Sequence, residues 1–375
     1  MPKNGVKRTK KNENILKLWV TAVSNKIKER IVSLKISKPS RVVNEILKDR
    51  ECLNSLKDLK ERFVITPIDK ASGNVALICK RFFAKVLIKE LGLDALSKSE
   101  TYQNIKRMTS NRIVQKQTQE LKTKFNLEVP DDSKLLPHIY WLPKLHKNPI
   151  KFRFIIAAPN CSVNPLSKAV TKILKLFYRQ IEKYNSKSDF YLTAKTFWVI
   201  QNNEDVLKSI SKINRRNSAR SINTYDFSTL YTKIPHQKLL EVLNELVDFC
   251  FKGGTHEQLS LTNSGAKWVS KSSKTGLIFD RIAIKDAIKY LMGNCYFTFG
   301  EKIFRQIIGI PMGSDPAPFM ANLFLYHYES NWTKNLKQNS IQRARMFRHT
   351  FRYKDDLLTI NDNDEFSKSF IDIQL

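Results

Sequence analysis

Acidic residues are scarce in this chain: 35 Asp and Glu stand against 65 Lys and Arg, which gives a formal net charge of +30 over 375 residues. The imbalance predicts a partner of opposite charge, either nucleic acid or an anionic membrane surface. Long apolar runs are also absent, since none reaches the roughly 18 residues of a membrane span, and the N-terminal "MPKNGVKRTKKNEN" lacks the apolar core of a secretory signal. We therefore expect no membrane association, an intracellular location and a nucleic-acid partner.

Paired cysteines and clustered histidines are missing as well. The cysteines are scattered singly, so neither a disulfide framework nor a zinc site can be derived from their spacing: they are Cys52, Cys79, Cys161, Cys250 and Cys295. The six histidines are equally dispersed. This pattern indicates a reducing compartment and no zinc. The hydrophobic fraction of 42% is typical of a folded protein with a sizeable core.

The first 60 residues predict a basic helical arm. Apolar residues recur at helical spacing among lysines in "ILKLWVTAVSNKIKERIVSL", and the pattern repeats after Pro39 in "RVVNEILKDRECLNSLKDLKERF". Two interpretations fit this arm equally well: its basic face is only solvated, or it contacts nucleic-acid phosphates.

Strands and helices alternate over the rest of the chain. "FVITPIDKASGNVALICKRFFAKVLIKELG" predicts a strand, a turn, a second strand and a helix that begins near Arg81. Further strands are predicted in "KFRFIIA", "SINTYDF" and "EKIFRQIIGIPMGS", and a polar loop is predicted up to about residue 280. Helices are predicted in "PLSKAVTKILKLFYRQIEKY", "HQKLLEVLNELVDFCF" and "DPAPFMANLFLYHYESNWTKN". This alternation is typical of an α+β sheet domain.

The segment "FRYKDDLLTI" places Asp355 and Asp356 between an aromatic and an apolar stretch. Because Asp is depleted in strands, the pair indicates either a simple hairpin turn or a charged site. Another carboxylate, Asp226, ends the strand predicted in "NTYDFSTLYTKIPH", 355 − 226 = 129 positions before Asp355. If the fold brings them together, bound Mg²⁺ would relieve their repulsion. Two such ions about 3.5 to 4 Å apart are the arrangement of a nucleotide polymerase.

Two further segments carry weaker signals. In "GIPMGSDPAPFMANLF", Gly309, Pro311 and Gly313 precede a predicted helix, where they either let the backbone approach a ligand or merely form a turn. Basic residues fall on or beside a strand in "LPKLHKNPIKFRFII": Lys144, Lys147, Lys151 and Arg153. They could bind a triphosphate, although a solvated edge strand has the same appearance.

The order of these segments resembles the motif series of reverse transcriptases, most closely those of Penelope-like retroelements, a group related to telomerase reverse transcriptases. The matching segments are "YWLPKLHKNPIKFRFI", "TYDFSTLYTKIPH", "FRQIIGIPMGSDPAP" and "RYKDD", within residues 60–375. The resemblance implies an α+β right-hand polymerase whose antiparallel palm sheet is flanked by helices. It implies a basic helical extension at residues 1–60, fingers and an upstream region at 61–215, and the palm at 216–375, with the reverse transcriptase domain at 135–375.

The resemblance also assigns roles to individual residues. Asp226 and Asp355 match the metal-binding aspartates, with the Phe227 carbonyl as a further ligand and Asp356 as an accessory catalytic carboxylate. Tyr231 matches the aromatic residue that lies under the incoming sugar and excludes a 2′-hydroxyl, although a core tyrosine is the alternative. The other nucleotide-binding matches are Lys144, Lys147, Arg153, Met312 and Gly313. "PIDKASGNVALI" resembles an upstream family segment to which no role can be assigned.

These matches imply an RNA-directed DNA polymerase that transfers nucleotides onto a primer 3′-hydroxyl with two Mg²⁺ ions, or with Mn²⁺. Its partners would be an RNA template, a DNA primer and deoxynucleoside triphosphates, in the nucleus. The oligomeric state is not predicted.

Two departures from the family pattern leave alternatives open. Lys354 stands where the family usually has an apolar or small residue, and it either pairs with Asp356, touches a primer phosphate or marks a decayed site. The sequence ends 375 − 356 = 19 residues after Asp356, before the expected thumb and before the GIY-YIG endonuclease of many relatives, so it is either a gene fragment or a shortened product. The alternatives are a non-catalytic nucleic-acid-binding remnant and an RNA-directed RNA polymerase, and Tyr231 argues against the latter.

Overall fold

The computed structural model describes residues 50–192, 195–216, 220–227, 230–252, 257–270 and 276–361, together with Thr21 and Asn25. Most of the basic arm predicted for residues 1–60 lies outside the described residues, and its last part is helix α3 (Arg50–Arg62). None of the helices in these ranges is both long enough and apolar enough to cross a membrane.

The described chain divides into a small unit, residues 50–66 and 75–83, and a larger unit, residues 67–74 and 84–361. Strands β1 (Phe63–Ile68) and β2 (Ala71–Cys79) pair in a two-stranded sheet, and α4 (Lys80–Glu90) follows directly. The predicted order of strand, turn, strand and helix is confirmed. The boundaries at residues 60 and 215 stay predictions.

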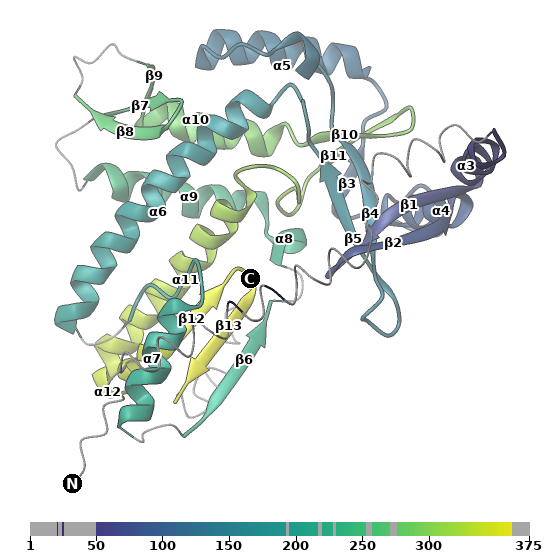
Figure 1. Cartoon of the computed structure of the whole chain (residues 1–375). Helices are drawn as coiled ribbons and strands as arrows, with labels where there is room; N and C mark the ends of the chain where they lie inside the picture. Colours follow the sequence, from purple (N-terminus) through teal and green to yellow (C-terminus); the bar gives the residue numbers. More distant parts are fainter. Residues whose placement is uncertain are drawn as a thin grey trace. The chain divides into compact units, whose positions relative to one another are not determined.

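A five-stranded sheet of the larger unit joins segments that are far apart in the sequence (Figure 1). Its strand order is β3, β11, β10, β4, β5, in which β4 pairs antiparallel with β5 and parallel with β10. Alternation of buried Ile139 and Trp141 with less buried residues gives β4 one core-facing side. The strands are β3 (Tyr102–Asn104), β4 (His138–Lys144), β5 (Lys151–Ala157), β10 (Tyr296–Phe299) and β11 (Lys302–Gln306).

The hydrophobic core of the larger unit lies among its long helices. One stripe of α6 is fully buried, with Leu166, Val170 and Phe177 at helical spacing, and it packs against the apolar faces of its neighbours. The helices of this core are α5 (Ser110–Phe125), α6 (Asn164–Leu192), α9 (His236–Lys252), α10 (Arg281–Gly293) and α11 (Ala317–Asn339). The helices predicted at α6, α9 and α11 are confirmed.

The polar loop predicted up to residue 280 is wrong. Three short strands form an antiparallel sheet there, with β7 in the centre: β7 (Gln258–Thr262), β8 (Gly265–Val269) and β9 (Leu277–Asp280). Buried Leu259, Leu261 and Phe279 attach this sheet to the helical core. Each strand is only four or five residues long and is flanked by polar turns. The period-two alternation is therefore too short to be recognised within a segment of polar composition.

A second three-stranded antiparallel sheet has the order β12, β13, β6. One face packs through Leu357 and Tyr225 near the end of α11, and the other face is covered at one end by Ile213 of α7. The strands are β6 (Ile222–Asp226), β12 (Thr350–Tyr353) and β13 (Asp356–Ile360). The shorter helices are η1 (Asp131–Ser133), α7 (Glu204–Arg215), α8 (Leu230–Lys233), α12 (Ile341–Met346) and η2 (Phe347–His349).

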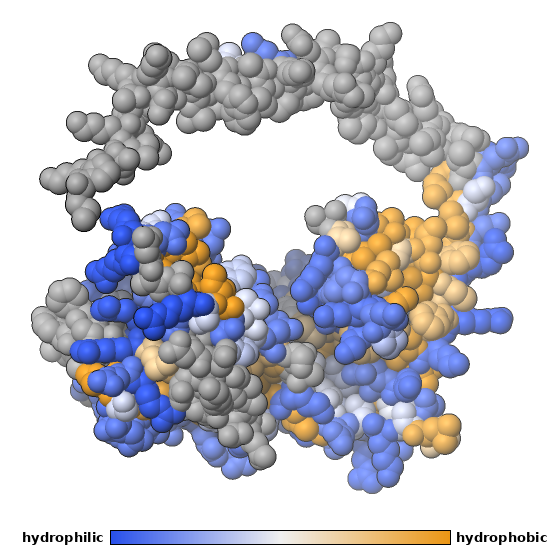
Figure 2. Space-filling model, turned by 90° about the horizontal axis from the view of Figure 1, so that it is seen from below, coloured by the Kyte–Doolittle hydropathy of each residue, from blue (hydrophilic) through white to orange (hydrophobic). Residues whose placement is uncertain are grey.

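Among the residues that Figure 2 colours, hydrophilic side chains are widespread, and hydrophobic residues gather in separate patches. Among the described residues, exposed side chains carry much positive charge, for example on α5, where Lys116, Lys122 and Lys124 are all exposed. Such a surface suits a polyanionic partner.

Candidate active site

The carboxylates singled out in the sequence meet at one end of the β12, β13, β6 sheet. Tyr353 pairs with Asp356 across the hairpin, so Lys354 and Asp355 form a two-residue turn, which we call the acidic turn. Asp356 in turn lies directly opposite Asp226, and residues opposite one another in an antiparallel pair point to the same face. The Phe227 N–H donates to the Asp355 carbonyl at 3.2 Å. The fold thus unites groups that lie 129 or 130 positions apart.

The hairpin turn predicted at Asp355 is confirmed, because Asp355 occupies a turn. A turn alone, however, does not require Asp226 opposite Asp356. Like charges directly opposite one another destabilise a strand pair unless a cation lies between them. The pairing therefore favours the charged-site interpretation.

The oxygen donors at this end of the sheet fit a Mg²⁺ ion that is shared with a substrate. Mg²⁺ is usually bound by one or two carboxylates together with waters and substrate phosphates. Asp226 and Asp356 are exposed, which leaves room for such partners. Among the described residues, no three His, Cys, Asp or Glu side chains form a ready metal site.

Tyr231 lies on α8, close to the acidic turn. Its side chain is partly buried against the helical core, and burial raises the pKa of its hydroxyl. The negative charge of Asp355 raises that pKa further. Tyr231 thus packs against the core and also interacts electrostatically with Asp355.

The loop that begins at Gly309 is fastened to α8 through the backbone. The Ile310 N–H donates to the Tyr231 carbonyl at 2.7 Å, and the Gly309 N–H donates to the Ile234 carbonyl at 2.8 Å. Gly309 has a φ of +83°, and a Cβ there would lie 2.5 Å from the Tyr231 carbonyl oxygen. Only glycine satisfies both conditions.

The other end of this loop is fastened to β5. The Ile156 N–H donates to the Met312 carbonyl at 3.0 Å, and a Cβ on Gly313 would lie 2.5 Å from the Ile156 carbonyl oxygen. Both glycines therefore allow close approach of the loop backbone to other segments of the chain. As a result, the loop links Tyr231 to the strand that carries Arg153.

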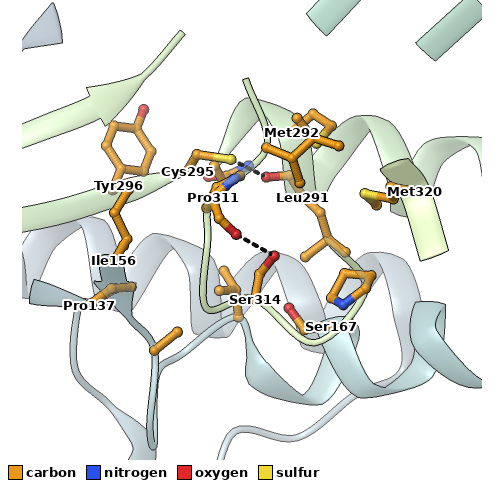
Figure 3. Close-up of a pocket in the computed structure, with 15 residues that line it drawn as sticks. Pro137, Ile156, Ser167, Leu291, Met292, Cys295, Tyr296, Pro311, Ser314 and Met320 are labelled. Atoms are coloured by element: carbon orange, nitrogen blue, oxygen red, sulfur yellow. Dashed lines mark hydrogen bonds between the residues drawn. The ribbon is translucent and has the colours of Figure 1, made fainter. Parts of the chain in front are cut away.

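A pocket of about 50 Å³ lies beside this loop (Figure 3). The Ser314 hydroxyl donates to the Pro311 carbonyl at 3.1 Å, and the Cys295 thiol donates to the Leu291 carbonyl at 3.1 Å. The pocket is lined by uncharged, mostly apolar residues, so it does not suit a phosphate group. We assign it to packing of the loop.

The basic residues of the β4 and β5 hairpin face one side of their sheet. Lys144 lies opposite Lys151 and Leu142 lies opposite Arg153, which puts Lys144, Lys151 and Arg153 on the same face. Burial lowers the pKa of Lys144, and the nearby positive charge of Arg153 lowers it further. Lys147 lies in the turn, where its N–H donates to the Lys144 carbonyl at 3.1 Å. The hairpin thus concentrates positive charge.

A buried ion pair behind the acidic turn was not predicted from the sequence. Arg352 on β12 and Glu329 on α11 are both fully buried, and the guanidinium donates from Nε and Nη2 to the two carboxylate oxygens. Nη1 donates to Asn322 Oδ1 at 2.8 Å and to the Lys354 carbonyl at 2.9 Å, and Nη2 donates to the Asn322 carbonyl at 3.1 Å. All five guanidinium N–H donors are thereby used. The sequence signal that could have indicated this ion pair is Arg352, a charged residue inside the short strand β12.

This ion pair supports the turn that carries Asp355. Lys354 has a φ of +58°, a backbone conformation that costs a non-glycine residue about 1 to 2 kcal/mol. The bond from Arg352 to the Lys354 carbonyl stabilises it there. The Lys354 ammonium lies 5.2 Å from the ring centroid of Tyr353.

Gly309→Ala is expected to destabilise the protein by about 2 to 4 kcal/mol, because left-handed strain adds to a collision with the Tyr231 backbone. Gly300→Ala is the matched control, since Gly300 also has a positive φ, of +57°, but nothing lies within 4 Å of its added Cβ. Urea denaturation of both variants measures the difference. Equal costs would show that the loop is not tightly fastened to α8.

No family model matches the sequence, and no curated protein matches it. Solved telomerase structures match the fold. The telomerase of Candida albicans in complex with a TWJ fragment of telomeric RNA gives a TM-score of 0.56 at 12% identity, over 85% of this chain and 48% of that one. Apo telomerase from Candida tropicalis, truncated from its C-terminal domain, gives 0.54 at 10% identity, over 88% and 57%.

These similarities show that the chain has a telomerase-like reverse transcriptase fold of mixed α+β type. The chain spans about half the length of the telomerase chains that it matches.

Proposed function

We propose that this chain is the polymerase part of an RNA-directed DNA polymerase of the Penelope-like group. The observation that carries the proposal is the cross-strand pairing of Asp226 with Asp356, beside the turn that holds Asp355. In this proposal, the β12, β13, β6 sheet is the palm, within residues 216–375. The five-stranded sheet belongs mainly to the fingers, within residues 61–215.

The carboxylates would bind the metal ions that accompany the nucleotide. Asp226 and Asp355, with the Phe227 carbonyl, would hold two Mg²⁺ ions, and Asp356 would add negative charge beside them. Bound there, the ions would activate the primer 3′-hydroxyl and stabilise the leaving pyrophosphate. The ladder between β13 and β6 fixes the backbone positions of Asp226 and Asp356 relative to one another, and such a transfer depends on positioned groups.

The nucleotide would extend from the carboxylates toward the basic hairpin. Lys144, Lys147 and Arg153 would bind its triphosphate, because their positive charges lie together on or beside β4 and β5. Met312 and Gly313 would border the base and template. An RNA template and a DNA primer would bind the cationic surface, and two of the telomerase neighbours are complexes with a telomeric RNA fragment.

Primer extension tests this function. The purified protein, with Mg²⁺, a DNA primer on an RNA template and deoxynucleoside triphosphates, is expected to lengthen the primer. Extension with ribonucleotides only would instead identify an RNA polymerase. No extension with either substrate, combined with tight template binding, would identify a non-catalytic binding protein.

Tyr231→Ala is expected to admit ribonucleotides while deoxynucleotide incorporation stays measurable. The Tyr231 ring would lie under the sugar, where a 2′-hydroxyl collides with it, and a collision of about 3 to 4 kcal/mol gives several hundredfold selection. Tyr231→Phe is the control and should keep the selection. Loss of both substrates together with thermal stability would instead assign Tyr231 to the core.

A further inference from the structure

The turn between β1 and β2 holds a buried carboxylate that the proposed function does not use. Asp69, in the larger unit, is 6% exposed. Its N–H donates to the Pro143 carbonyl at 3.1 Å, and its Oδ1 lies 2.9 Å from Nη1 of Arg153. Its second oxygen, Oδ2, is buried without a hydrogen-bond partner among the described residues. Burying a carboxylate this deeply is costly, so a role beyond local packing is expected.

Arg153 is held by this carboxylate but is not enclosed by it. The Arg153 side chain is 35% exposed, whereas that of Asp69 is 5% exposed. The Arg153 guanidinium therefore stays accessible to solvent, while the buried Asp69 carboxylate holds it at Nη1. A planar guanidinium fixed in this way presents its remaining donors in one orientation, which suits recognition of phosphate oxygens.

Positive charge exceeds negative charge around Asp69. The pKa of Lys144 is lowered first by burial and then by Arg153, Lys147 and Lys70, whereas Asp69 alone opposes this shift. These four cations and one carboxylate leave a formal charge of 4 − 1 = +3. The positive charges around the partly buried Lys144 repel one another, and a bound anion would reduce this repulsion.

We propose that the turn formed by Asp69 and Lys70 is part of the triphosphate-binding site, in which Asp69 is a positioning residue that orients Arg153 and Lys70 contacts a phosphate. This rests on the proposed function, and it assigns a role to the "PIDK" segment. Lys70 is exposed and has a φ of +61° at the tip of the turn. The bond from Asp69 to Pro143 ties this turn to the end of β4, next to Lys144.

Binding of inorganic tripolyphosphate to the purified protein, measured by calorimetry without metal, tests the proposal directly. Asp69→Asn removes a negative charge, so charge alone predicts tighter binding, whereas loss of positioning predicts weaker binding. We expect binding about tenfold weaker, equivalent to about 1.4 kcal/mol. Unchanged or tighter binding by folded Asp69→Asn would overturn the positioning role.

Lys70→Asn tests the second residue and does not depend on the stability of Asp69 variants. Asn tolerates the left-handed backbone, so this variant loses the charge without added strain. It is expected to bind tripolyphosphate several-fold more weakly than the unmodified protein, and unchanged binding would exclude Lys70 from the site. The surface pair formed by Asp131 and Lys134 supplies the controls, because Asp131→Asn and Lys134→Ala should leave binding unchanged.

The route through Arg153 is tested by a double variant and by steady-state kinetics. In an Arg153→Gln background, Asp69→Asn should have little further effect on tripolyphosphate binding, and a full additional effect would contradict positioning through Arg153. In primer extension, Asp69→Asn should raise KM for the nucleotide more than it lowers kcat, which a general structural defect would not do. If tripolyphosphate binding depends on Asp69 and Lys70 but no primer extension occurs, the proposed polymerase function is rejected and the phosphate-binding site is kept. If extension occurs and the KM for the nucleotide is unchanged in the Asp69 and Lys70 variants, only this inference is rejected.

Discussion

Asp355→Asn is expected to abolish primer extension while the fold stays intact. The substitution removes one of the carboxylate charges that would bind the two Mg²⁺ ions. We expect the extension rate to fall about 1000-fold or more, which corresponds to about 4 kcal/mol of transition-state stabilisation. The bond from the Phe227 N–H is retained, since it ends on the backbone carbonyl of Asp355. Reduced repulsion with Asp356 is expected to raise the thermal stability slightly.

Single-turnover extension and thermal melting of the same preparations provide the measurement. Asp226→Asn should show the same loss, because Asp226 lies opposite Asp356 at the same end of the sheet. Asp286→Asn on α10 is the matched control, since Asp286 is exposed on a helix of the core and should be neutral in both assays. Undiminished extension by Asp355→Asn would reject the site assignment.

Glu329→Ala is expected to destabilise the protein by about 3 to 5 kcal/mol, because it leaves the fully buried Arg352 guanidinium without its carboxylate. Burial raises the pKa of the Glu329 carboxyl, and Arg352 opposes that rise, so each charge depends on the other. The substitution is also expected to destabilise the acidic turn, since Arg352 donates to the Lys354 carbonyl as well. Extension should therefore fall even at temperatures where the variant is folded.

Urea denaturation tests the interdependence. Arg352→Met combined with Glu329→Leu should cost less than Glu329→Ala alone, because no buried charge is left unpaired. Glu128→Ala breaks a surface pair with Lys122, whose side chains are 85% and 71% exposed, and should cost about 0 to 1 kcal/mol. A cost for Glu329→Ala as small as that of the control would show that the buried pair contributes little.

Much of the candidate site could be proposed from local sequence. Three segments carry residue types that are uncommon in their secondary structure: the aspartates of "KDD", the two glycines before α11 and the basic residues of one strand. Such exceptions to local sequence rules are expected at functional sites. Their order then gave the resemblance to reverse transcriptases, and the solved telomerase structures agree with it at the level of the fold. The roles of the individual residues stay predictions.

The sequence alone determined the α+β alternation, the positions of helices α6, α9 and α11 and the hairpin at Asp355, because helical periodicity and turn residues are local properties. Only the tertiary structure decided that Asp226 lies opposite Asp356, that Arg352 pairs with Glu329 inside the core and that Asp69 holds Arg153. Strand register and burial depend on contacts between distant segments, and no local pattern states which lysine or arginine faces water and which is enclosed.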